Sequence, residues 1–170
     1  NFGYPVFNAD KEVEKLYKKN KKIFLKLKKV LPNFIQSYPI NKSEIIKAIL
    51  SNKVNLKKII SVIHFEIRKE MKKFLRNNKK KKIVILDIPL LLENKINKKG
   101  DILIFVKSKR SEINKRLKKR NNFNKILLVE FKKLQLPIDY KKKKSHFIIE
   151  NNFTKKFIKK GIKEILKEIR

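Results

Sequence analysis

An uninterrupted apolar run constrains the fold of this chain more than any other feature. The segment IVILDIPLLLEN, residues 83–94, opens with four large apolar residues, reaches Asp87, and turns at Pro89. Its first four residues do not alternate with polar ones, which is typical of a strand buried on both faces of a parallel sheet. The run is too short and too interrupted to cross a membrane, which takes about 20 apolar residues. It therefore predicts an internal strand.

Segments with helical periodicity separate this strand from three others. Alternating helices and strands predict an α/β fold with a parallel sheet, in a single domain spanning residues 1–170. Ser43 and Ser108 are the expected N-caps of two helices. Besides residues 83–86, strands are expected at 5–7, 102–106 and 146–150, and helices at 10–30, 43–50, 55–76, 108–120, 124–135 and 157–169.

The net charge of +33 invites a nucleic-acid interpretation, but the kind of cation argues against it. Only six of the 48 basic residues are arginine, and the lysines are spread along almost every segment. A dedicated nucleic-acid surface would concentrate arginine and aromatic residues on one face. We therefore predict a solvated surface and no specific nucleic-acid site. A non-catalytic basic nucleic-acid-binding module stays as the alternative, and salt-sensitive polyanion binding is expected either way.

The sequence contains no cysteine, which excludes disulfides and thiolate metal sites and makes the reducing cytoplasm the default location. No secretory signal or membrane span is visible in it, so no membrane partner is expected. The sequence gives no indication of the oligomeric state.

Polar residues follow the expected strands, at the edge of a parallel sheet where ligands bind. They are Asp10, Asp87 with Glu93, the cationic segment 107–110, and Asn151. Phosphoryl transfer uses such a set, because carboxylates orient a hydroxyl or hold Mg²⁺ through water and cations neutralise the phosphate. Taken singly, a carboxylate at a strand end is more often a helix cap.

Two arginines strengthen the phosphate hypothesis. Arg116 and Arg120 lie one turn apart on the expected helix SEINKRLKKR. A guanidinium grips phosphate with two parallel hydrogen bonds, which an ammonium cannot do. A solvated helix face explains the same spacing, so the spacing alone does not decide.

Five segments in this order resemble one family. They are FGYPVFNAD, VIHFEI, DIPLLLEN, INKRLKKR and LQLPIDYKKKKSHFIIEN, and together they resemble the motifs of dephospho-CoA kinases over essentially the whole chain. The last segment keeps four family positions, namely Gln135, Pro137, Lys141 and Asn151. The departures from the family pattern are Asn8 (usually Asp), Phe65, Leu92, Ile113, Ser145 and His146.

This resemblance implies ATP-dependent phosphorylation of the ribose 3′-hydroxyl of dephospho-CoA, the last step of coenzyme A synthesis, with Mg²⁺ accompanying ATP. It implies a three-layer parallel sheet of the P-loop nucleoside triphosphate hydrolase type. It also implies a mainly helical coenzyme-binding subdomain at residues 11–80 and a lid at 108–140. Another P-loop nucleotide or nucleoside kinase, with a different acceptor, is the alternative among enzymes.

The resemblance also assigns site residues. Asp10 would accept or orient the proton of the acceptor hydroxyl, Arg116 would bind ATP phosphates with help from Arg120, and Asn151 would line the adenine site. Asp87 is the expected metal-site residue, through water. The remaining substrate-binding candidates are His64, Pro89, Leu90 and Glu93. For His64 alone, an ordinary histidine on a helix face is the simpler interpretation.

The family's P-loop, Gly-x-x-x-x-Gly-Lys-Ser/Thr, has no counterpart around Gly3, Gly100 or Gly161. In the family this loop lies immediately before the segment with which the chain begins. We therefore expect the natural product to carry about one further βα unit with the first strand. The chain as given is expected to be poorly stable alone and inactive toward ATP.

Overall fold

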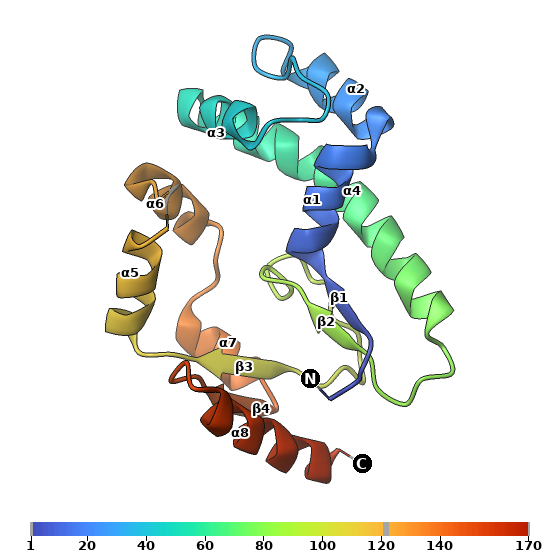
Figure 1. The fold of residues 1–170 in the computed structure, drawn as a ribbon, viewed down its shortest axis with the longest axis vertical. Coiled ribbons are helices and arrows are strands. Elements are labelled where there is room, and N and C mark those ends of the chain that lie inside the picture. The colour runs from blue at the N-terminus through green and yellow to red at the C-terminus, as the bar shows by residue number, and fades with distance from the viewer. Residues whose placement is uncertain (1, 121–122, 170) are drawn as a thin grey trace. The chain divides into compact units, whose positions relative to one another are not determined.

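The computed structural model describes residues 2–120 and 123–169, which fall into two compact units, Asn1–Pro89 and Leu90–Arg170 (Figure 1). The elements of the first unit are β1 (Val6–Asn8), α1 (Ala9–Lys19), α2 (Lys21–Val30), α3 (Lys42–Ser51), α4 (Lys53–Asn77) and β2 (Ile85–Asp87). Those of the second unit are β3 (Ile104–Lys107), α5 (Arg110–Lys118), α6 (Lys125–Lys133), α7 (Ile138–Lys144), β4 (Phe147–Glu150) and α8 (Lys155–Glu168).

The long helix α4 organises the core of the first unit. Its apolar stripe follows helical spacing, and α1, α2 and α3 all pack against it. The buried members of this stripe are Leu56, Ile59, Ile63, Ile67 and Met71. Each such side chain contributes about 1.5–3 kcal/mol by leaving water. Phe74 extends the stripe and contacts Phe7 of β1, with ring centroids 5.6 Å apart, so α4 also holds the strands in place.

Strand β1 pairs in parallel with β2, with Val6 opposite Ile85 and Asn8 opposite Asp87. The expectation that residues 83–86 form a strand buried on both faces is only partly met. Parallel pairing is as predicted, but the strand begins at Ile85 and the side chain of Ile85 is exposed. The reason is that α4 covers the face carrying Phe7, whereas Val6 and Ile85 share the other face, which stays open.

The single helix expected over residues 10–30 is wrong, because Asn20 divides it into α1 and α2. The backbone N–H of Asn20 donates to the carbonyl of Leu16 at 3.0 Å, which ends α1. Its side-chain oxygen accepts the N–H of Ile23 at 3.1 Å and so caps α2. An asparagine side chain competes in this way with the continuing helix, while the apolar spacing on either side is unaffected.

The expected serine caps are wrong as well. The N-cap of α3 is Asn41, whose side chain accepts the N–H of Ser43 at 3.0 Å. Helix α5 begins after Lys109, without a side-chain cap, and not at Ser108. In both places a helix starts within two residues of its expected position, and a neighbouring residue takes the cap position.

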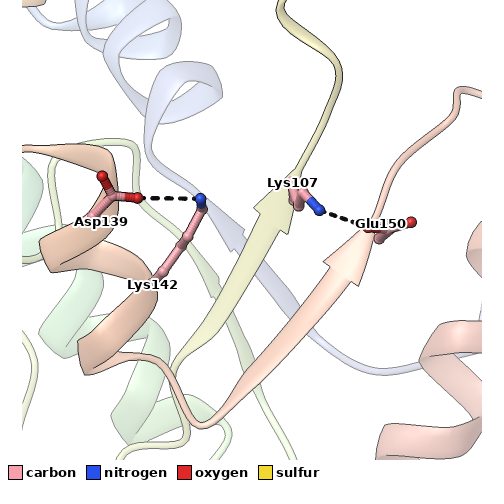
Figure 2. Close-up of polar contacts among 4 residues, drawn as sticks. All are labelled: Lys107, Asp139, Lys142 and Glu150. Carbon is pink, nitrogen blue, oxygen red and sulfur yellow. Dashed lines mark hydrogen bonds and ion pairs between the residues drawn. The ribbon is translucent and has the colours of Figure 1, made fainter.

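The second unit is built on β3 and β4, which pair in parallel from Ile104 opposite Phe147 to Lys107 opposite Glu150. Helix α8 packs along β4, where Ile149 and Ile165 are buried (Figure 1). Helix α7 is not among the expected helices, because Pro137 predicts only the end of the preceding helix. Proline with φ −52° also suits a helix start, and the Asp139–Lys142 ion pair at 3.2 Å lies along the new helix (Figure 2).

Strands alternating with helices are thus present as predicted, paired two by two within the units. Among the described helices, none has both the length and the apolar character that a bilayer span requires.

Candidate active site

The carboxyl ends of β1 and β2 bring Asn8 and Asp87 together. Because the two strands pair with Asn8 opposite Asp87, both strands end at the same level of the sheet. The amide nitrogen of Asn8 donates to Asp87 Oδ2 at 2.5 Å, and its oxygen accepts the N–H of Lys11 at 2.9 Å. One side chain therefore caps α1 and fixes the Asp87 carboxylate.

Asp10 lies two residues beyond Asn8, in the first turn of α1, with an exposed side chain. The unpaired N–H groups in the first turn of a helix favour a negative charge nearby. The structural role of the Asp10 carboxylate is therefore to stabilise the start of α1. Its exposure at the end of a parallel strand also leaves it able to accept a proton from a bound hydroxyl within hydrogen-bond reach.

Asp87 is the predicted metal-site residue. Within residues 2–120 and 123–169, no three His, Cys, Asp or Glu side chains gather into a group that could hold an ion. Mg²⁺ rarely uses an all-protein cage and is more often bound through one or two carboxylates, waters and substrate phosphates. The exposed carboxylate of Asp87, held by Asn8, fits that donor chemistry.

His64 lies on α4 and is half-buried. Burial lowers its pKa below the ordinary 6.5, and the positive charge of Arg68 lowers it further, so the imidazole is neutral at pH 7. This is how a histidine on a partly covered helix face behaves. Pro89, the last residue of the first unit, is exposed.

Glu93 forms an ion pair that no local pattern in the sequence indicates. Its carboxylate pairs with Lys141 Nζ at 2.5 Å and accepts the N–H of Leu136 at 3.0 Å. The side chains of Glu93 and Lys141 are only 9% and 16% exposed. Burial raises the pKa of Glu93, but the bonds from Lys141 and Leu136 outweigh burial and hold it below the ordinary 4.5. The carboxylate thus ties the turn after Leu90 to the segment that leads into α7.

Asn151 follows β4 and is bonded to the end of β3. Its N–H donates to the carbonyl of Lys107 at 2.7 Å, and its side-chain oxygen accepts the N–H of Phe153 at 2.8 Å. The guanidinium carbon of Arg116, on α5, lies 3.8 Å from the centre of the Phe153 ring. Two predicted site residues, Asn151 and Arg116, thus both contact Phe153, a residue that was not among the predicted ones.

Two further predictions can be placed. Arg120 lies beyond the end of α5 at Lys118, so the expectation that it shares this helix with Arg116 is wrong. The carbonyl of Leu90 accepts two hydrogen bonds from Asn94, one from the backbone N–H at 3.1 Å and one from the side-chain amide at 2.8 Å. These bonds help close the turn that contains Glu93.

Known proteins resemble this chain over nearly its whole length. The family model described as dephospho-CoA kinase matches residues 1–156. A dephospho-CoA kinase from Wolbachia pipientis is 33% identical across 97% of this chain and 85% of its own length. One from Bartonella quintana is 30% identical across 86% of this chain and 76% of its own length.

Solved structures agree on the fold. A Thermus thermophilus protein superimposes with a TM-score of 0.74 at 22% identity, covering 99% of this chain and 86% of that one. A dephospho-CoA kinase from Campylobacter jejuni gives a TM-score of 0.62 at 23% identity, covering 98% of this chain and 85% of that one. These likenesses confirm the predicted α/β fold with parallel strands.

Proposed function

Because this chain belongs to the dephospho-CoA kinase family, we propose that it transfers the γ-phosphoryl group of ATP to the ribose 3′-hydroxyl of dephospho-CoA. The match of the family model to residues 1–156 carries this conclusion. In the reaction the 3′-oxygen forms a bond to the γ-phosphorus while the bond to the bridging oxygen of ADP breaks. The products are coenzyme A and ADP.

Asp10 is our candidate for the group that receives the proton of the attacking hydroxyl. Its support is its position beyond β1 and its exposed carboxylate. A carboxylate in hydrogen-bond reach of the hydroxyl orients the oxygen and takes up its proton as the new bond forms.

Arg116 and Arg120 are our candidates for binding ATP phosphates, and Asn151 for lining the adenine site. Guanidinium groups neutralise the charge that spreads over the transferring phosphoryl group. The side-chain oxygen of Asn151 accepts the Phe153 N–H at 2.8 Å, which orients the amide and leaves its NH2 group able to donate. A fixed amide suits the recognition of an adenine edge by hydrogen bonds.

Mg²⁺ belongs to the proposal as the companion of ATP, with Asp87 holding it through water. When bound, the ion neutralises charge on the β- and γ-phosphates. The protein's own part is to keep the Asp87 carboxylate in one orientation, which the bond from Asn8 at 2.5 Å supports.

The remaining assignments concern regions. We propose that the helical part within residues 11–80 binds the coenzyme portion of the acceptor and that residues 108–140 act as a lid. His64, Pro89, Leu90 and Glu93 stay candidates for the acceptor site, although the pairing of Glu93 with Lys141 favours a supporting role for Glu93. We also propose that the reaction takes place in the cytoplasm, in keeping with a cysteine-free sequence.

The test is ADP release with Mg²⁺ and ATP by the protein expressed from its complete reading frame. We expect ADP only when dephospho-CoA is present, and a product phosphorylated at the ribose 3′ position. Nucleosides and nucleotides serve as competing acceptors. Faster ADP release with one of them would assign the protein to another kinase class. No acceptor-dependent ADP from a folded sample, together with salt-sensitive polyanion binding and no preference for the coenzyme, would favour the nucleic-acid alternative.

A further inference from the structure

The contact between Arg116 and Phe153 joins two parts of the second unit that are distant in sequence. Arg116 is an exposed residue of α5, and Phe153 lies in the loop between β4 and α8. The guanidinium lies over the ring, 3.8 Å from its centre. At this distance the two flat groups are in van der Waals contact, and the ring face attracts the cation.

The backbone of Phe153 is unusual. Its φ of 63° lies in the left-handed region, which a bulky side chain rarely adopts and which glycine adopts freely. The conformation is held by the Asn151 side chain, which accepts the Phe153 N–H at 2.8 Å. Asn151 is in turn bonded to Lys107 at the end of β3. A strained residue maintained by specific bonds points to a use for its side chain.

These contacts link the end of β3, helix α5 and the loop after β4 to one another. Strand β3 ends at Lys107, and α5 begins three residues later at Arg110. Arg116 of α5 contacts the ring of Phe153. The N–H of Phe153 is bonded to Asn151, and the N–H of Asn151 is bonded to the carbonyl of Lys107. The backbone of Phe153 is therefore tied to the end of β3, and its ring lies against the guanidinium of Arg116.

Stacking leaves the arginine able to bind a phosphate. The N–H groups of a guanidinium lie in its plane and point outward from its edge. A ring on one face covers none of these donors, so the edge can still make two parallel bonds to phosphate oxygens. An arginine on an exposed helix otherwise samples many rotamers, and that freedom is lost when the ligand binds.

We propose that Phe153 is a positioning residue for Arg116, one that holds the guanidinium ready for the phosphates of ATP. The inference rests on the proposed role of Arg116 in binding ATP. It assigns to Phe153 an effect on nucleotide affinity, exerted through Arg116, and no effect on the acceptor or on the chemical step.

The test compares Phe153→Leu, Phe153→Gly and Phe153→Tyr in the protein from the complete reading frame. Leucine removes the ring face but keeps an apolar side chain, and glycine removes it while suiting the positive φ, so the two variants disturb the fold in different ways. We expect both to raise the KM for ATP roughly threefold to fivefold, as loss of a cation–ring contact predicts. Both should leave kcat and the KM for dephospho-CoA within twofold. Phe153→Tyr keeps the ring and should therefore leave the KM for ATP at its wild-type value.

Arg116→Ala separates this inference from the proposed function. We expect it to raise the KM for ATP by more than either Phe153 variant, and Phe153→Gly to have no further effect in its background. If Arg116→Ala weakens ATP binding while the Phe153 variants do not, the inference alone fails. If Arg116→Ala leaves the KM unchanged, the proposed role of Arg116 fails and the inference with it. A lower KM in Phe153→Gly would mean that the ring withholds Arg116 from ATP, which also overturns the inference.

Discussion

Glu93 and Lys141 form an ion pair that differs in its surroundings from the exposed pairs of the same unit. Lys107 and Glu150, at the ends of β3 and β4, are 2.8 Å apart but 51% and 61% exposed (Figure 2). Water and salt weaken such an exposed pair, whereas a covered pair is costly to break because one charge is left without its partner. The two glutamates therefore offer a matched comparison.

Glu93→Gln is expected to lower the free energy of unfolding by about 1–3 kcal/mol, since Lys141 loses its counter-charge in a mostly covered position. The amide oxygen of glutamine can still accept the Leu136 N–H, so the change isolates the charge. The measurement is the urea midpoint at pH 7. Glu150→Gln is the control and should leave the midpoint unchanged; equal effects of the two variants would contradict the account.

The pH dependence of stability should identify the same carboxylate. The pKa of Glu93 is lower in the folded protein than in the unfolded chain, where it lies near 4.5. Its stabilising contribution is therefore complete above pH 4.5 and is lost as the pH falls through the folded-state pKa. We expect the urea midpoints of the wild type and Glu93→Gln to differ at pH 7 and to converge in acid. A difference that does not shrink as the pH falls below 4.5 would mean that the charge is not responsible.

Among the elements, the break between α1 and α2 depends on one side chain. Asn20→Ala removes the acceptor for the Ile23 N–H and is expected to cost about 1 kcal/mol of stability. Chemical denaturation measures the loss. Asn33→Ala, at an exposed position of the loop after α2, is the matched control and should be close to neutral. If both variants behave alike, Asn20 does not hold the break.

The sequence predicted the elements better than their ends. Apolar spacing sufficed for the long helix α4, and unalternating apolar runs sufficed for β2 and β3. The break at Asn20 and the start of α7 at Pro137 depend on hydrogen bonds and backbone angles that leave the apolar pattern unchanged.

The candidate site shows the same division. Asp87 and Asn151 could be placed because each comes at or just after the end of an apolar run in the sequence. Phe153 could not, because a positive φ at a phenylalanine and a contact with an arginine 37 positions earlier have no local signature. The pairing of Glu93 with Lys141 is likewise long-range, although both residues belong to the motifs through which the chain resembles its family.

At the scale of the whole molecule, the net charge of +33 should make stability depend on salt. Like charges spread over the surface repel one another in the folded state, and ions screen this repulsion. Raising sodium chloride from about 0.05 to about 0.5 M is expected to raise the thermal midpoint by about 2–4 °C. Potassium chloride at equal ionic strength should act alike. A midpoint that falls with salt would show that favourable ion pairs dominate the surface.

The central claim is that this family member uses Asp10 to activate the acceptor hydroxyl. The most direct measurement is kcat for ADP release with dephospho-CoA by Asp10→Asn, compared with Glu12→Gln. Both variants exchange an acid for its amide in the first turn of α1. We predict that Asp10→Asn lowers kcat by about 10²–10⁴-fold and that Glu12→Gln leaves it nearly unchanged. Equal and small effects of both would contradict the claim and leave Asp10 with only its structural role at the start of α1.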